Sequence, residues 1–406
     1  MTDAPKNIVI LGAGFAGVRA ALDLAARQDE LADHRIVLVD RNTYHLFTPW
    51  LYERASTGSP VHGLKIPLAS IFHGWPVDLV HGEVQTIDRT RHQIRLTNRV
   101  NLTYAYLVVA LGSVSNDCGI PGIAAHALPL KTYADAERIR AETEAQYRDF
   151  LASAQPTALF QVVIGGAGTT GVELTGEVHR HLKHLAQRLG DGEGRFVVKL
   201  VEAEDRLLPG FPDWVSRAAH VRLGQYRRIE ILLQSRIASV TAHTVTLTSG
   251  DTHQSPVFIW TGGVRTNPRV GADLLGDGGR IPVNRMLQLP NDPDVFAIGD
   301  NAGPSGGRSK TECPLTIQNA YAQGSAAAAN LIRHIRGQPL VPLVIDHPGF
   351  IVPVRGHWAV STIGRPLVGH LAYWLLRLVH LRYFLWILPF SEAVRRWYRR
   401  DEERHA

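Results

Sequence analysis

The sequence is poor in cysteine: among its 406 residues only Cys118 and Cys313 occur, and they lie far apart. Two distant cysteines cannot form a CxxC redox pair, a zinc knuckle or a cysteine-ligated iron–sulfur cluster. This excludes flavoprotein reductases that work through a vicinal dithiol. Hydrophobic residues make up 45% and charged residues 20% of the chain, so a disordered or disulfide-stapled protein is excluded as well.

Lysine is also scarce, and an N-terminal targeting pattern is absent. Only six of the 43 basic residues are lysine, and the net charge is +6. Residues 341–406 hold nine arginines against five acidic residues, together with four of the eight tryptophans. Basic and aromatic residues together suit a nucleic acid or a membrane surface. The first five residues show neither a basic region nor an apolar core, so we expect no secretion signal.

The N-terminal pattern of strand, glycine turn, helix, strand and acid is typical of dinucleotide binding. An apolar run at 7–11 leads into Gly12-Ala13-Gly14-Phe15-Ala16-Gly17, and a second strand at 35–39 ends at Asp40. Gly12 permits the tight turn, Gly14 lets the backbone approach a pyrophosphate, and Gly17 packs helix on strand. The helix N-terminus offers N–H groups to phosphate, and Asp40 can accept a hydrogen bond from a ribose hydroxyl.

This pattern occurs a second time. A strand at 160–164 leads into Gly166-Ala167-Gly168-Thr169-Thr170-Gly171, and a later strand at 196–201 ends at Glu202. Each copy is followed by a hairpin-like stretch, at 84–97 and at 237–249, and then by an apolar strand ending in glycine. One such motif is weak evidence, but two copies with matching context predict two dinucleotide sites. A later strand ends at Gly299-Asp300, where an acid can bind the ribityl hydroxyls of a flavin, so we expect one nucleotide to be FAD.

Several segments resemble type II NADH dehydrogenases. The run from Asp40 to Tyr52 resembles the family segment after the second strand, and residues 166–177 resemble its second glycine motif. Residues 297–300 match the second FAD motif of the family, and Ile317-Gln318-Asn319-Ala320 with Gln323-Gly324 resembles its quinone-site helix. The resemblance spans nearly the whole chain, and it implies a glutathione-reductase-like flavoprotein architecture.

The resemblance also implies which residues bind the two cofactors. FAD would be held by the first glycine motif, Asp40, Arg41, Val84, Gly112, Asp300, Ile317 and Gln318. NADH would be held by Gly166, Gly168, Thr169, Thr170, Gly171, Glu202, Gly262 and Gly263. Because Glu202 is followed by two further acids, a 2′-phosphate is repelled and NADH is favoured over NADPH, although Arg206 could soften this preference.

Glu173 matches a family glutamate placed near the nicotinamide, the isoalloxazine and the quinone. We expect it to supply a proton to the quinone. The alternative is an exposed acid in the first helical turns, favoured there by the helix dipole.

The quinone helix departs from the family pattern. The family typically has Ala-Gln with a second Gln four residues after the first, whereas here Ile317 precedes Gln318 and Ala322 takes the later position. Gln323 comes one residue further on, which is about 100° of helix rotation. We expect a quinone at Gln318, Ala322 and Gln323, with this departure affecting the contact.

Residues 367–400 predict membrane association rather than a membrane span. Their apolar runs are interrupted by Arg377 and Arg382, and a spanning helix needs about 20 apolar residues. We expect an amphipathic helix in the interface, with Trp374, Tyr383 and Trp386 at headgroup depth and with arginines facing anionic lipid: Arg395, Arg396, Arg399 and Arg400. The alternative is a buried docking helix or a dimer seam. The resemblance to the membrane-attachment region of the family favours the first.

Together these patterns predict an α/β protein with two Rossmann-like domains and a C-terminal amphipathic helical membrane-attachment segment. Residues 1–118 with 265–340 would bind FAD, residues 119–264 would bind NADH, and residues 341–406 would attach to the membrane. The expected activity is that of a non-pumping NADH:quinone oxidoreductase with FAD. We place it peripherally on the cytoplasmic side of a bacterial inner membrane, with no nucleic-acid partner and with a homodimer allowed.

Two alternatives remain, and no metal is expected. A sulfide:quinone oxidoreductase-like enzyme would use Cys118 and Cys313, which we otherwise expect to be structural. An NADH-sensing flavoprotein would bind partners through its C-terminal face. His179, His181 and His184 share one helix, but no Cys or carboxylate pair completes a metal site, so a solvated helix is expected instead.

Overall fold

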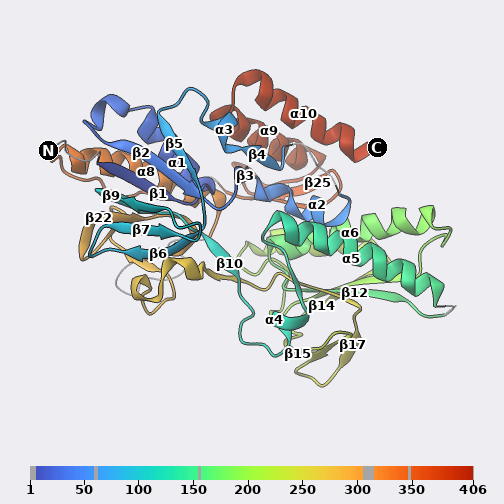
Figure 1. The fold of residues 1–406 in the computed structure, drawn as a ribbon. Helices are drawn as coiled ribbons and strands as arrows, with labels where there is room; N and C mark the ends of the chain where they lie inside the picture. Colours follow the sequence, from blue (N-terminus) through green and yellow to red (C-terminus); the bar gives the residue numbers. More distant parts are fainter. Residues whose placement is uncertain (1–5, 59–62, 154–156, 305–314, 346–348, 406) are drawn as a thin grey trace. The chain divides into compact units, whose positions relative to one another are not determined.

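A computed structural model describes residues 6–58, 63–153, 157–304, 315–345 and 349–405. Its contacts divide the chain into two units: the first comprises residues 1–46, 65–114 and 264–347, and the second comprises residues 47–64, 115–263 and 348–406. Figure 1 shows the course of the chain through both. Each unit is described by itself.

The first unit is built on a six-stranded sheet in the order β21-β22-β9-β1-β2-β5, parallel except for β21. Its strands are β1 (Asn7–Leu11), β2 (Arg35–Asp40), β5 (Val77–His81), β9 (Tyr106–Val109), β21 (Gln288–Leu289) and β22 (Asp292–Ala297). Ile8 to Leu11 are fully buried, which explains the unbroken apolar run. Helices α1 (Phe15–Ala25) and α8 (Ile317–Ile335) pack side by side (Figure 1).

Smaller elements complete the first unit. An antiparallel sheet contains β6 (Val84–Asp88), β7 (Gln93–Leu96) and β8 (Asn101–Thr103). The others are η1 (Gln28–Glu30), β3 (Tyr44–Leu46), β4 (Lys65–Pro67), α3 (Leu68–Ile71), β10 (Ser113–Ser115, ending at the unit boundary), β19 (Val264–Thr266), η3 (Pro268–Val270), η4 (Ala272–Leu274), β20 (Ile281–Val283), η5 (Gly299–Asn301) and β23 (Ala302–Pro304).

The second unit repeats the plan of the first. Its five-stranded parallel sheet has the order β11-β18-β12-β13-β14, so β18-β12-β13-β14 corresponds to β9-β1-β2-β5. The strands are β11 (Leu128–Pro129), β12 (Phe160–Gly165), β13 (Phe196–Val201), β14 (Ile229–Leu232) and β18 (Val257–Trp260). An antiparallel sheet of β15 (Ile237–Val240), β16 (Thr244–Leu247) and β17 (Thr252–Gln254) corresponds to β6-β7-β8. The structure thus extends the internal repeat from the glycine motifs to whole sheets.

Helices surround the second sheet. They are η2 (Thr48–Trp50), α2 (Leu51–Ser56), α4 (Ile123–His126), α5 (Tyr133–Ala152), α6 (Thr169–Arg188) and α7 (Asp213–Gly224). The short helix α2 packs on both α5 and α6. A Thr132 capping box with Asp135 starts α5.

The C-terminal residues also belong to this unit. They form a three-stranded sheet of β24 (Ile351–Arg355), β25 (Trp358–Ser361) and β26 (Leu367–Gly369), followed by α9 (His370–Ile387) and α10 (Phe390–His405). The sequence predicts a separate segment from 341; in the structure residues 348–406 join the second unit, because β24 packs on α6 and α9 packs on β25. Within the described residues no helix has the length and apolar composition needed to cross a bilayer.

Candidate functional site: two nucleotide loops and a carboxyl pair

The first glycine loop connects β1 to α1 and is shaped by two close backbone approaches. Gly12 has φ +104°, and a Cβ there would lie 2.3 Å from the carbonyl oxygen of Ala110. A Cβ at Gly17 would lie 1.8 Å from the carbonyl oxygen of Gly12. A Cβ at Gly14, in contrast, would meet no heavy atom within 4 Å. The backbone therefore packs closely at Gly12 and Gly17 but leaves free space at Gly14, as a loop that binds a pyrophosphate requires.

Two side chains hold this loop in place. The backbone N–H of Ala13 donates to Asp40 Oδ2 over 2.6 Å, and the N–H of Asn42 donates to the other carboxylate oxygen. His45 is fully buried, its Nδ1 lies 2.9 Å from the Ala13 carbonyl oxygen, and burial lowers its pKa to about 4. His45 is therefore neutral at pH 7 and donates to Ala13 through Nδ1–H. Asp40 and His45 together fix both polar groups of one loop residue.

The second FAD motif lies in the same unit. Asn301 is fully buried; its Oδ1 accepts from the Gly112 N–H over 2.8 Å, and its Nδ2 donates to the Val109 carbonyl. Ser113 Oγ donates to Asp300. The structure therefore brings together Gly112 and Asp300, which the resemblance assigns to FAD. Of the other expected residues, Val84 is buried at the start of β6, and Arg41 lies half exposed with Nη1 3.8 Å from Glu83.

Helix α8 holds the turn of the second FAD motif through Gln323. Gln323 is buried, and its Oε1 accepts from the Gly299 N–H over 2.6 Å. Gly324 allows the close crossing with α1, since a Cβ there would lie 2.5 Å from the Ala16 carbonyl oxygen. The Gln323 amide oxygen thus holds the Gly299–Asp300 turn, and the contact of Gln323 with a quinone stays a prediction. Ile317, Gln318 and Ala322 are partly exposed along α8.

The second glycine loop connects β12 to α6 and has close backbone approaches at corresponding positions. Gly166 has φ +93°, and a Cβ there would lie 2.8 Å from Gly262 Cα. A Cβ at Gly171 would lie 1.9 Å from the Gly166 carbonyl oxygen, whereas one at Gly168 would meet no atom within 4 Å. Thr169 and Thr170 begin α6 and are partly exposed, so their N–H groups start the helix where a phosphate would bind.

Glu202 has the position that Asp40 has in the first unit. Its Oε2 accepts from the Ala167 N–H over 2.6 Å, and its Oε1 accepts from the Glu204 N–H. Arg206, the residue that could have favoured a 2′-phosphate, is ion-paired with Asp213 and donates to the Pro209 carbonyl. Arg206 is therefore not free to bind a 2′-phosphate beside Glu202. This is the arrangement expected for NADH.

Gly263 lies in the loop after β18 and has φ +148°. Its carbonyl accepts from the Asn116 N–H over 3.0 Å, and a Cβ would lie 3.9 Å from Cys118 Sγ. Cys118 is an exposed free thiol, and partial burial followed by the charge of Asp117 raises its pKa. Cys313 lies outside the described residues, so a pair with Cys118 stays untested.

Glu173 lies on α6 beside an acid that sequence reasoning missed. Burial, and then the charge of Glu53 on α2, raise the pKa of Glu173 well above its usual value. Glu53 is fully buried and accepts a hydrogen bond from the Tyr52 hydroxyl over 3.0 Å. Glu173 itself is partly exposed to solvent. Two carboxyl groups in a poorly solvated site resist double ionisation, which favours the protonated form of Glu173.

The C-terminal helices differ from the expected single amphipathic helix. Residues 367–369 form β26 instead, and α9 and α10 follow. The prediction for Tyr383 is wrong: it is buried and packs at 5.3 Å from the Phe47 ring, in an aromatic cluster where Trp50 Nε1 donates to His380 Nδ1 over 3.1 Å. Trp374 and Trp386 are exposed as expected, at 54% and 45%.

The arginines of α10 also differ in their exposure and partners. Arg396 is ion-paired with Glu392 at 2.6 Å, so the prediction that it faces lipid is corrected. Arg395 and Arg399 are exposed, while the side chain of Arg400 lies outside the described residues. Arg377 is buried, donates to the Trp397 carbonyl and lies over the Trp397 ring. These contacts with Trp397 partly compensate the burial of an arginine in an otherwise apolar helix.

Two of the three histidines on α6 are buried rather than solvated, contrary to expectation, whereas His184 is exposed. His179 and His181 are buried; the pKa of His179 is lowered to about 4, chiefly by burial, and His181 lies 3.3 Å from Glu144. Their role is to pack α6 in the unit. Among the described residues no group of three or more histidine, cysteine or carboxylate side chains is placed to hold a metal.

Comparison with known proteins agrees with this site. Residues 6–324 match the family described as pyridine nucleotide-disulphide oxidoreductase, so the chain belongs to this family. A type II NADH:quinone oxidoreductase of Staphylococcus haemolyticus is 27% identical over 390 residues, covering 94% of this chain and 96% of the relative. Its counterpart from Staphylococcus aureus is 26% identical over 388 residues, with the same coverage. The predicted resemblance to type II NADH dehydrogenases is confirmed.

Solved structures confirm the predicted fold. NDH2 from Plasmodium falciparum in complex with NADH superimposes with a TM-score of 0.82 at 16% identity, covering 98% of this chain and 97% of that chain. The sulfide:quinone oxidoreductase from Aquifex aeolicus gives a TM-score of 0.74 at 19% identity, covering 94% and 91%. At these identities the likeness concerns the fold, which both activities share.

Proposed function

We propose that this chain is a flavin-dependent NADH:quinone oxidoreductase. The observation that carries the proposal is the duplicated loop: Ala13 with Asp40, and Ala167 with Glu202, form the same 2.6 Å contact in two separate sheets. One chain therefore offers two nucleotide sites of the same design. The curated relatives of similar length, named type II NADH:quinone oxidoreductases, support assigning one site to FAD and one to NADH.

The residues fit both cofactors. Gly14 and Gly168 each leave open space beside the N-terminus of a helix, which is where a dinucleotide pyrophosphate binds. FAD would lie on the loop 12–17 with Asp40, Gly112 and Asp300, and NADH on the loop 166–171 with Glu202 and Gly263. When bound, FAD supplies the acceptor for a hydride from NADH and the donor of two electrons to a quinone. The protein binds and orients the two dinucleotides and supplies a proton.

Glu173 is the group we assign to that proton. Burial and the charge of Glu53 raise the pKa of Glu173, and a carboxyl with a raised pKa is better suited to donate a proton to the quinone. Asp and Glu at their usual pKa values would already be ionised at pH 7. The quinone itself would lie near Gln318, Ala322 and Gln323 on α8.

A second candidate, sulfide oxidation, is disfavoured by the state of Cys118. A reactive cysteine needs a lowered pKa, since the thiolate is the nucleophile, but the pKa of Cys118 is raised. If the flavin of this protein is reduced by NADH and unaffected by sulfide, and Cys118→Ser behaves as wild type, sulfide oxidation is excluded. Reduction by sulfide that is lost in Cys118→Ser would reverse the assignment.

We also propose that the protein attaches peripherally to the cytoplasmic side of a bacterial inner membrane through α9. Leu371, Trp374 and Leu378 recur three and four residues apart and are 72%, 54% and 55% exposed. An exposed apolar strip with tryptophan suits the interface of a bilayer, and lipid attachment brings the enzyme to a membrane-dissolved quinone. Homodimerisation through the same strip is the competing proposal.

Substitution of the outward residues tests this attachment better than deletion does. Removing α9 would expose the aromatic cluster around Phe47, because Tyr383 and Phe384 pack against it. Leu371→Ser with Leu378→Ser keeps that cluster intact. We expect this variant to lose sedimentation with lipid vesicles while retaining FAD; retention of vesicle binding together with loss of a dimer in sedimentation velocity would favour the dimer seam.

A further inference from the structure

An open pocket of about 300 Å³ lies on the second unit, formed by α7, β25 and β26. Its apolar walls are Ala218, Val221, Trp358 and Val368, and its polar walls are Arg217, Arg222 and Gln225. Among the residues that the structure describes, no acid lines it, and none of the lining residues belongs to the loop 166–171 or to the carboxyl pair. The pocket therefore combines two cations with apolar walls at a place that the proposed reaction does not use.

Neither arginine is neutralised by an acid among the described residues. Arg217 lies four residues after Asp213 on α7, but Asp213 pairs with Arg206 instead. The Arg222 guanidinium lies over the Trp358 ring at 5.4 Å and donates from Nη1 to Gln225, while its Nε is buried without a hydrogen-bond partner. Guanidinium groups bind phosphate through paired hydrogen bonds, so two arginines without acidic partners at one pocket favour a phosphate as ligand.

The apolar side of the pocket includes Val368, which lies just before α9 in the sequence. Val368 is 52% exposed and pairs with Val360 in the β25–β26 ladder, three residues before Leu371 on the exposed strip. A molecule with its phosphate at the arginines could therefore extend an apolar chain over Val368 toward Leu371. A small soluble anion would leave Val221 and Val368 uncovered, whereas a phospholipid covers them.

We propose that this pocket binds the headgroup of an anionic phospholipid, with its phosphate on Arg217 and Arg222 and its first methylene groups on Val221 and Val368. The inference rests on the proposed function only in that α9 lies on a membrane. It requires neither NADH nor a quinone, so its failure is separate from failure of the redox assignment.

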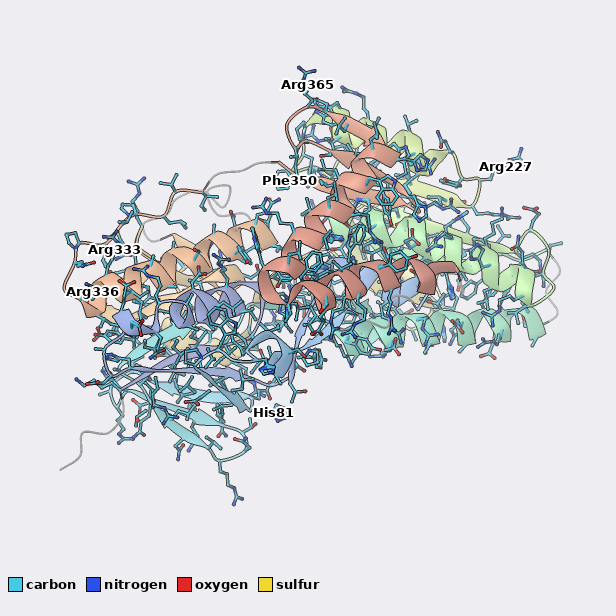
Figure 2. The ribbon with its side chains drawn as sticks, turned by 90° about the horizontal axis from the view of Figure 1, so that it is seen from above. His81, Arg227, Arg333, Arg336, Phe350 and Arg365 are labelled. Atoms are coloured by element: carbon cyan, nitrogen blue, oxygen red, sulfur yellow. The ribbon has the colours of Figure 1, made fainter. Side chains whose placement is uncertain are left out.

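The test uses the FAD-loaded full chain and a short-chain phosphatidylglycerol below its micelle concentration, measured by titration calorimetry. The variant Arg217→Gln with Arg222→Gln is compared with Arg227→Gln, an exposed arginine outside the pocket lining; Figure 2 shows Arg227 and Arg365 pointing away from the ribbon. Retention of FAD shows that each variant is folded. Val368→Ser, at an exposed position, provides a second variant that leaves both arginines in place.

We expect saturable binding of phosphatidylglycerol, about tenfold or more weaker in the double arginine variant and changed less than about twofold in Arg227→Gln, given about 1 kcal/mol per basic residue beside an anionic lipid. Val368→Ser should weaken binding of the lipid, and phosphatidylcholine should bind at least tenfold more weakly than phosphatidylglycerol. Equal binding of sn-glycerol 3-phosphate would overturn the lipid assignment in favour of a soluble phosphate. Equal losses in the double variant and Arg227→Gln would overturn the pocket in favour of diffuse charge attraction. Binding of soluble lipid without binding to vesicles would support the pocket and refute membrane attachment through α9.

Discussion

The carboxyl of Glu173 on α6 lies close enough to Glu53 on α2 for the charge of Glu53 to raise its pKa, in addition to the larger effect of burial. Both residues belong to the second unit, and Glu53 is the more deeply buried of the two. A buried acid next to another acid is costly to the fold. Its presence beside the second glycine loop therefore points to a role in moving protons.

Removing the charge of Glu53 should make Glu173 a stronger acid. In Glu53→Gln the amide keeps the Tyr52 hydrogen bond but no longer repels a carboxylate, so the pKa of Glu173 falls. We expect the pH at which flavin reoxidation by quinone declines to move to a lower value, while flavin reduction by NADH stays unchanged. Rapid-mixing kinetics across pH measure both steps. Glu193→Gln, at an exposed position, serves as the control. A pH profile of Glu53→Gln identical to that of the wild type would contradict the effect of Glu53 on the pKa of Glu173.

The same carboxyl makes stability depend on pH in a defined direction. The unfolded chain releases the Glu173 proton at the ordinary pKa of glutamate, whereas the folded chain retains it to a higher pH. The folded state therefore binds more protons, and its stability falls as pH rises through this interval, by at most about 1.4 kcal/mol per pH unit. In Glu173→Gln this loss disappears. Urea unfolding at several pH values tests it, and parallel curves for the two proteins would contradict it.

Two glycines of the first loop should respond to alanine in different ways. Gly17→Ala places a Cβ 1.8 Å from the Gly12 carbonyl oxygen, so the loop must shift, and we expect lost FAD and a lower melting temperature. Gly14→Ala meets no protein atom, so its apoprotein should keep its stability within about 1 kcal/mol, with at least tenfold weaker FAD binding. Thermal unfolding of apoprotein and flavin titration separate the two effects. If Gly14→Ala takes up FAD as wild type does, the pyrophosphate does not lie there.

Glu202 should control nucleotide choice without affecting the flavin. In Glu202→Ala the Ala167 N–H loses its acceptor and the ribose loses a charged partner. We expect NADH binding to weaken by about ten- to a hundredfold, in line with about 1.5–3 kcal/mol for a hydrogen bond to a charged group. The preference over NADPH should shrink as well. Asp205→Ala keeps the Ala167 contact and is the matched control; equal effects of both variants would assign the preference to net charge alone.

Much of this site could be predicted from the sequence because its signals are local. Gly12, Gly17, Gly166 and Gly171 follow from the spacing of a turn that only glycine tolerates, and Asp40 and Glu202 follow from their position at the end of a strand. The pairing of β9 with β1 and of β18 with β12 follows the same repeated plan.

The remaining features depend on long-range contacts. The hydrogen bond from the Gly299 N–H to Gln323 could not be predicted, because the sequence gives the helix position of Gln323 but not its partner. Glu53 was missed because it meets Glu173 only when α2 packs on α6, although an acid next to Trp50, Leu51 and Tyr52 is an unusual neighbour for an apolar helix. For Tyr383 and Arg396 the sequence predicts a position facing lipid, because a helical wheel does not reveal the aromatic cluster at Phe47 or the pairing with Glu392.

The central claim is that one chain holds a flavin, takes electrons from NADH and delivers them to a quinone. The most direct test is anaerobic double mixing of the FAD-loaded protein, first with NADH and then with a short-chain quinone, while the flavin absorption is followed. The account predicts rapid bleaching by NADH and full recovery of the flavin bands with quinone, with slow bleaching in Glu202→Ala. A flavin that NADH does not bleach, or one that stays reduced in the presence of quinone, would contradict it.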